Sequence, residues 1–124
     1  MTISSIIFSY LMLISPNLQV ENTTKVTWYG EVFHGRKTAN GEIFDMNALT
    51  CASPTLPFNT RIKITNPSNG KTVTVRVNDR GPWKIVEGKY IPHPTRAFDL
   101  SKAAFQSIAD LSRGVITVKF EILK

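Results

Sequence analysis

Cysteine is nearly absent from this sequence, because Cys51 is the only one among 124 residues. A single cysteine excludes an intrachain disulfide, and we expect Cys51 to be a small buried hydrophobe. His34 and His93 are the only histidines, and neither lies in a motif that would pair it with a nucleophile. No cysteine–histidine cluster has the spacing of zinc ligands, so we expect no zinc site.

Long hydrophobic runs are lacking too. Residues 6–14 are apolar, but a membrane-spanning helix needs about 20 such residues. The run resembles the central part of a secretory signal, although no Lys or Arg precedes it and no A-x-A-like cleavage site follows. The alternative is an ordinary buried segment. We favour export to the cell envelope or beyond. Residues 1–24 are then an export signal or N-terminal anchor plus joint, and residues 25–124 form one domain.

Acidic residues are scarce, since nine Asp and Glu face fifteen Lys and Arg, for a net charge of +6. This excess suits an anionic partner, such as nucleic acid, an anionic lipid surface or an acidic cell-wall polymer. The basic residues are scattered rather than clustered on one element, which argues against nucleic acid.

Short alternating runs predict a mainly β domain. Residues 61–66 and 71–77 alternate apolar and polar side chains around a turn at 66–70, which indicates a β-hairpin. We also expect strands near 26–30 and at 115–123. Residues 30–55 and 83–97 are expected to be a long structured loop and an irregular excursion.

One helix is expected within residues 98–114, where apolar residues recur at helical spacing. Asp99 or Ser101 is expected to cap its first turn, and Gly114 to end it. The apolar stripe is interpreted as core. With the strands, this predicts a compact small barrel with one short helix.

The stretch VNDRGPW, residues 77–83, raises the question of function. Asp79 is either a turn residue or a carboxylate presented at a site. Breaking a glycosidic bond needs a proton donor and charge stabilisation, which Asp and Glu usually supply. Glu42, Asp45 and Asp79 are the candidates. Arg36 and Arg80 lie close in sequence to the loops that hold these carboxylates, so they could bind an anionic substrate. The alternative is that the carboxylates are ordinary solvated turn residues, which is common beside Gly and Arg.

Three long motifs carry a resemblance to a known family. They are WYGEVFHGRKTANGEIFDMNALT, LPFNTRIKITNPSNGKTVTVRVNDRGP and FDLSKAAF. Over about residues 26–123 the sequence resembles the rare lipoprotein A (RlpA) family. The resemblance implies a six-stranded double-psi β-barrel, related to expansin and barwin domains. It also implies lytic transglycosylation of peptidoglycan glycan strands without metal or cofactor. We expect the protein to be a monomer.

By motif position, Asp79 and Glu42 match the acidic catalytic residues of that family. The resemblance implies that a carboxylic acid protonates the glycosidic oxygen, and that a carboxylate helps the muramic acid C6 hydroxyl attack the anomeric carbon. Which residue takes which part stays open. Tyr29 and Phe33 match the wall of the substrate groove, and Trp83 is the aromatic residue most suited to line it.

Two departures from the family pattern stand out. Ser53 occupies a position in the substrate site where family members commonly carry a histidine. The segment WKIVEGKYIPHPTR, residues 83–96, is longer than the usual link. An expansin-like wall-binding module without turnover is therefore the alternative, and a basic nucleic-acid-binding barrel is a third hypothesis.

Overall fold

The structure is a computed structural model that describes residues 22–124. The expected export signal or anchor lies outside the described residues. Within residues 22–124, no helix is long and apolar enough to cross a membrane.

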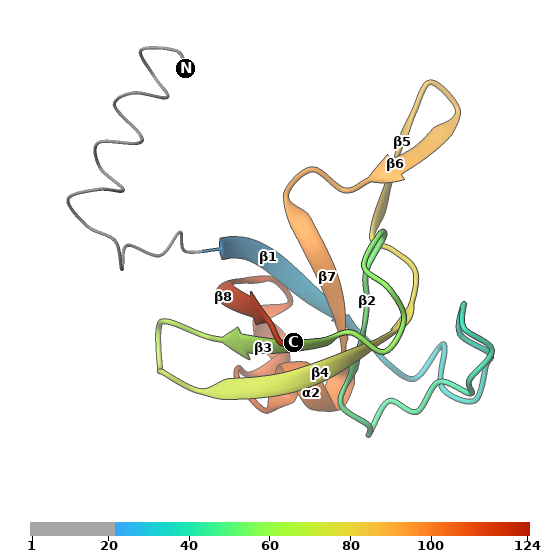
Figure 1. Cartoon of the computed structure of the whole chain (residues 1–124). Coiled ribbons are helices and arrows are strands. Elements are labelled where there is room, and N and C mark those ends of the chain that lie inside the picture. Colours follow the sequence, from blue (N-terminus) through green and yellow to red (C-terminus); the bar gives the residue numbers. More distant parts are fainter. Residues whose placement is uncertain (1–21) are drawn as a thin grey trace, which may run out of the picture.

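Six strands close into a barrel in the order β1-β7-β2-β4-β3-β8 (Figure 1). Two neighbouring pairs, β1 with β7 and β2 with β4, run parallel, and the others are antiparallel. The expected double-psi β-barrel with one short α-helix is confirmed. The barrel strands are β1 (Asn22–Tyr29), β2 (Thr50–Ala52), β3 (Arg61–Thr65), β4 (Thr72–Asp79), β7 (Arg96–Ser101) and β8 (Ile116–Ile122).

The core of the barrel follows from alternation along its strands. Val73, Val75 and Val77 of β4 are buried, and the residues between them face outward. Burying one such valine stabilises the fold by roughly 1.5–3 kcal/mol relative to an exposed one. Cys51 of β2 is fully buried in the same cluster, as we expected.

Two strand boundaries differ from the expected ones, and one strand was not expected. β1 begins at Asn22, ahead of residue 25, because Asn22 to Thr24 pair with β8. β2 lies inside the segment expected to be a loop. It is three residues long and wholly buried, so it shows no alternation. β4 continues to Asp79, which pairs with Ala52 instead of starting a turn.

The expected helix is shorter than its apolar stripe, because Arg96–Ser101 form β7. The helix α2 (Lys102–Gln106) begins after Ser101, whose Oγ accepts the N–H of Ala104 at 3.2 Å. Ser101 is therefore the cap, and Asp99 lies on a strand. A 3-10 turn, η1 (Leu111–Arg113), follows and ends at Gly114, where φ is +68°.

The excursion at 83–97 contains a second small sheet that we did not expect. β5 (Trp83–Val86) and β6 (Lys89–Pro92) form an antiparallel hairpin that stands away from the barrel (Figure 1). Both residues of its turn, Glu87 and Gly88, have positive φ. Such turns match the twist of hairpin strands.

Candidate functional site

A tight loop brings Glu42 onto the outward face of β4. The loop closes where the Thr38 N–H donates to the Glu42 carbonyl at 2.7 Å and the Gly41 N–H donates to the Thr38 carbonyl at 3.0 Å. Its tip contacts β4 where the Asn40 N–H donates to the Asn78 carbonyl at 3.4 Å. Glu42 therefore lies over the strand that ends at Asp79.

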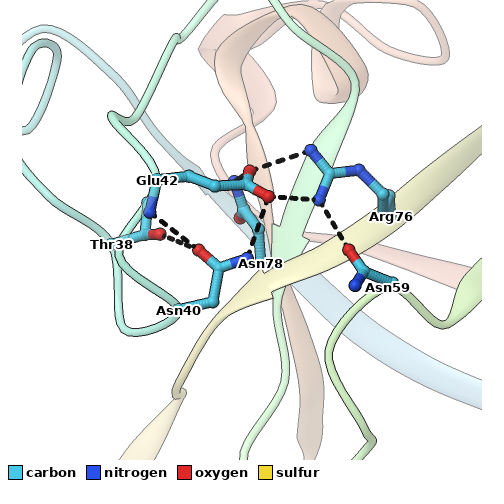
Figure 2. Close-up of polar contacts among 6 residues, drawn as sticks. All are labelled: Thr38, Asn40, Glu42, Asn59, Arg76 and Asn78. Atoms are coloured by element: carbon cyan, nitrogen blue, oxygen red, sulfur yellow. Dashed lines mark hydrogen bonds and ion pairs between the residues drawn. The ribbon is translucent and has the colours of Figure 1, made fainter.

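The Glu42 carboxylate is held by four hydrogen bonds (Figure 2). Arg76 of β4 donates to both oxygens, at 2.8 and 2.9 Å. The side-chain amides of Asn40 and Asn78 add bonds of 3.0 and 3.3 Å. These donors, the Arg76 guanidinium first, lower the pKa of Glu42 to about 2. Glu42 is therefore a fixed anion at neutral pH.

The partners of Glu42 are themselves fixed. Asn40 Oδ1 accepts from the Thr38 hydroxyl at 2.7 Å and from the Glu42 N–H at 3.1 Å. Arg76 also donates to Asn59 Oδ1 at 3.0 Å, and its bond to Glu42 raises its pKa. A two-point bond between guanidinium and carboxylate sets direction as well as charge. The carboxylate therefore has a defined orientation over β4.

Asp79 lies at the end of β4 and binds the same loop. Its Oδ1 accepts the backbone N–H groups of Ala39 and Arg80, both at 2.9 Å. The Tyr29 hydroxyl donates to its Oδ2 at 3.4 Å. Burial and the Asp79 charge raise the pKa of Tyr29 well above its usual value, so its hydroxyl keeps its proton. One loop, residues 38–42, thus contacts both candidate carboxylates.

An aromatic group lies beside Asp79. The Tyr29 ring stacks on Phe44, with ring centroids 4.5 Å apart, and meets the edge of Phe33 at 5.8 Å. Phe44 is buried, whereas Phe33 is 48% exposed. Tyr29 and Phe33 are thus placed together next to Asp79, with Phe33 open to solvent.

Ser53 and Arg80 organise the loop that follows β2. Ser53 is buried, and its Oγ accepts the N–H groups of Thr55 and Leu56. Arg80 donates to the carbonyls of Ser53 and Leu56 at 3.2 and 2.9 Å, and its guanidinium lies 3.8 Å from the Phe58 ring centroid. The Ser53 N–H donates to the Asp79 carbonyl. Both side chains therefore support the backbone around Asp79.

The remaining expected binding residues lie further out. Asp45 is exposed, and its Oδ1 accepts the Asn47 N–H in a local turn. Arg36 is exposed, and its backbone pairs with that of Phe44. Trp83 is also exposed and begins the hairpin. Hydrogen bonds link Asp79 and Glu42 to the loop at residues 38–42, and Tyr29 to Asp79. Within residues 22–124, no such bond links Arg36, Asp45 or Trp83 to these three residues.

Sequence reasoning missed several groups at this face. Arg76 and Asn78 could have been predicted from the sequence, because alternation along β4 places their side chains on its outward face. Asp99 could not have been predicted in this way, since its segment was interpreted as part of the helix. It lies opposite Ala52, whose other neighbour is Asp79. Its Oδ1 accepts from the Thr27 hydroxyl at 2.6 Å and lies 3.7 Å from Arg96 Nε. Asp99 is thus a third carboxylate on this face.

Two other chemistries find no support in the arrangement. Within the described part of the chain, no group of three or more His, Cys, Asp or Glu side chains is placed to hold a metal ion. Burial raises the pKa of the Cys51 thiol to about 12, which keeps it protonated. Cys51 is therefore a core residue and not a nucleophile.

The sequence of this chain is similar to that of a curated bacterial protein. An endolytic peptidoglycan transglycosylase RlpA from Neisseria meningitidis serogroup A is 46% identical over 110 residues, 86% of this chain and 42% of the relative. The chain thus spans less than half the length of that curated relative.

Solved structures share the barrel. A Streptomyces papain inhibitor matches with a TM-score of 0.63 and 25% identity, over 87% of this chain and 98% of its own. An expansin of Clavibacter michiganensis matches with a TM-score of 0.61 and 20% identity, over 85% of this chain and 51% of its own. The expansin likeness concerns the fold.

The sequence model of the lytic transglycolase family covers residues 21–120, from the first strand of the barrel into the last. That span includes the loop at 38–42 and both carboxylates that it contacts. The chain therefore belongs to the lytic transglycolase family.

Proposed function

We propose that this domain is an endolytic peptidoglycan lytic transglycosylase. One observation carries the proposal: a single loop binds two carboxylates whose surroundings differ. Glu42 is held ionised by Arg76, whereas Asp79 accepts backbone N–H groups and the Tyr29 hydroxyl. Two carboxylates at one site are the usual suppliers of proton transfer and charge stabilisation when a glycosidic bond is broken. The curated relative named an endolytic peptidoglycan transglycosylase supports the same substrate.

The surroundings of Glu42 favour Asp79 as the residue that gives the proton. A group with a pKa of about 2 holds no proton at neutral pH, so Glu42 cannot be the general acid. It is also a weak base. Its part is to present a fixed negative charge to the positive charge that develops on the sugar ring. Asp79 is then the residue that transfers protons.

The proposed reaction uses Asp79 twice. Protonated Asp79 gives its proton to the oxygen that links muramic acid C1 to glucosamine, and the C1–O bond breaks. The resulting oxocarbenium-like centre is stabilised by Glu42. The C6 hydroxyl oxygen of the same muramic acid bonds to C1 and passes its proton to the Asp79 carboxylate. A 1,6-anhydro end forms, no water is consumed, and Asp79 is protonated again.

The cell envelope is the location that this substrate implies, since peptidoglycan lies there. Export is part of the proposal: the signal or anchor lies before Asn22, and the barrel, whose first strand begins at Asn22, is the catalytic domain. We further propose that the domain acts as a monomer, without metal or cofactor.

Product analysis in heavy-oxygen water tests the proposal. Purified protein incubated with sacculi should release fragments with 1,6-anhydromuramic ends that contain no heavy oxygen. Reducing ends that carry heavy oxygen would show hydrolysis and overturn the proposed reaction. Binding to sacculi without any released fragments would instead favour a wall-binding module of the expansin type.

A further inference from the structure

The β5–β6 hairpin has two unlike faces. In an antiparallel pair, residues directly opposite each other project to the same side. One face carries the pairs Trp83 with Pro92 and Ile85 with Tyr90. The other carries the pairs Lys84 with Ile91 and Val86 with Lys89. The first, which we name the apolar face, contains no charged side chain, and both lysines of the hairpin strands project from the second.

The apolar face is open to solvent. Tyr90 is 69% exposed, Ile85 is 61% exposed and Trp83 is 40% exposed. Single exposed hydrophobic residues are ordinary, but three adjoining ones on one side of a ribbon form a patch of the kind that marks an interaction site. The hairpin projects from the barrel, so its apolar face is not part of the core (Figure 1).

The apolar face begins beside the end of β4. The Trp83 indole lies against Gly81, where an added Cβ would come within 3.7 Å of the ring. Gly81 is two residues after Asp79. The root of the hairpin is closed by a bond of 3.1 Å from the His93 N–H to the Pro82 carbonyl. His93 Nδ1 accepts the backbone N–H groups of Thr95 and Arg96, so its ring stabilises the backbone that leaves the hairpin. The apolar face therefore begins next to the backbone that follows Asp79.

We propose that the apolar face is a glycan-binding platform for the sugar rings of the peptidoglycan strand, beyond the bond that is cleaved. The inference rests on the proposed function, which supplies the polymer. Sugar rings present apolar C–H surfaces, and Trp83 and Tyr90 offer aromatic rings on which such surfaces stack. Four residues per strand span about 13 Å at roughly 3.3 Å per residue, a length comparable with a disaccharide.

Charge supports this occupant. Lys84 and Lys89 lie on the opposite face, while the turn between the strands holds the only acidic residue of the hairpin, Glu87. The hairpin thus has a positive excess beside an uncharged stacking face. Peptidoglycan has the matching composition, because its sugar rings are uncharged and its lactyl-linked peptides carry carboxylates.

Binding without turnover tests the platform. In an Asp79→Asn background, Tyr90→Ala should weaken binding to sacculi and to peptide-free glycan strands by about 5-fold or more, since stacking contributes about 1 kcal/mol. Tyr90→Phe should restore binding because it keeps the ring. Ile91→Ala, one residue away on the opposite face, is the matched control and should change binding less than 2-fold, taken as roughly 0.4 kcal/mol or less.

Other occupants are distinguished in the same experiment. Tyr90-dependent binding to anionic phospholipid vesicles instead of glycan would overturn the proposal, as would Tyr90-dependent self-association with no glycan binding. Equal losses in the Tyr90→Ala and Ile91→Ala chains, or no loss in either, would overturn it too. Failure of the proposed function has a separate signature, namely wild-type protein that releases no anhydro ends. Tyr90-dependent glycan binding in such a protein would leave the platform standing.

Discussion

The Arg76 guanidinium donates to both carboxylate oxygens of Glu42, at 2.8 and 2.9 Å, although Arg76 and Glu42 are 34 residues apart in the chain. The pair joins a loop tip to the strand that ends at Asp79. Its side chains are 39% exposed for Glu42 and 38% for Arg76, so the bond contributes modestly to stability. Its larger consequence is the orientation of a negative charge on the loop that also binds the proposed proton donor.

Replacing Arg76 with lysine tests that orientation. Lysine keeps the charge but lacks the planar fork that binds both oxygens. We expect release of anhydro ends to slow by about 10-fold, which corresponds to about 1.4 kcal/mol of transition-state stabilisation. The melting temperature should change little. Wild-type rates in Arg76→Lys would show that the orientation of Glu42 is unimportant.

The low pKa of Glu42 predicts a pH dependence of stability. Its folded-state pKa, about 2, lies below the ordinary value of 4.5, so the folded state binds fewer protons. The ionised Glu42 carboxylate therefore stabilises the folded state fully above pH 4.5, and this stabilisation is lost as pH falls toward 2. Because the carboxylate is partly exposed, we expect at most about 1 kcal/mol.

Denaturant unfolding between pH 2 and 7 measures this effect. The curve of Glu42→Gln should fall less steeply than the wild-type curve between pH 4.5 and pH 2, the window set by the two pKa values. Parallel curves for the two proteins in this window would contradict the assignment.

Tyr29 provides a test in which the ring and the hydroxyl are separated. Tyr29→Phe keeps the stack on Phe44 but removes the hydroxyl that donates to Asp79. We expect a rate loss of up to about 10-fold, with stability lowered by about 1 kcal/mol or less. Tyr29→Ala should lower stability by about 3 kcal/mol, since the stack is lost. A Tyr29→Phe enzyme as unstable as Tyr29→Ala would contradict this separation.

Ser53 is expected to matter for stability and not for proton transfer. Its Oγ accepts two backbone N–H groups of the following loop. Ser53→Ala should therefore lower the free energy of unfolding by about 1 kcal/mol and leave the pH–rate profile in place. A displaced profile without a stability loss would give Ser53 a part in the chemistry.

Local patterns accounted for much of the barrel. The alternation of β3 and β4 predicted their hairpin, and the apolar stripe around Phe105 and Ile108 predicted core residues. The hairpin β5–β6 was not predicted, because its strands are exposed on both faces and show no alternation of buried and exposed residues. β7 was hidden because Phe98 and Leu100 also fit the helical spacing of the residues that follow.

The site was less accessible to sequence reasoning. Local reasoning gave Glu42, Asp45 and Asp79 as candidate carboxylates, and only motif resemblance selected Asp79 and Glu42 among them. It did not show which residues would hydrogen-bond to them. Thr27 and Asp99 are 72 residues apart in the chain, but the Thr27 Oγ1 lies 2.6 Å from Asp99 Oδ1 in the fold. Barrel closure creates such contacts, and it depends on the register of strands distant in sequence.

The rate of anhydro-end release by Asp79→Asn tests the central claim most directly. Asparagine keeps an oxygen that can accept the Ala39 and Arg80 N–H groups, so the variant should fold and bind glycan. It has no transferable acid proton, and we expect the rate to fall by a factor of about 10²–10⁴. Wild-type release of 1,6-anhydro ends by a folded Asp79→Asn protein would contradict the claim that Asp79 transfers the protons.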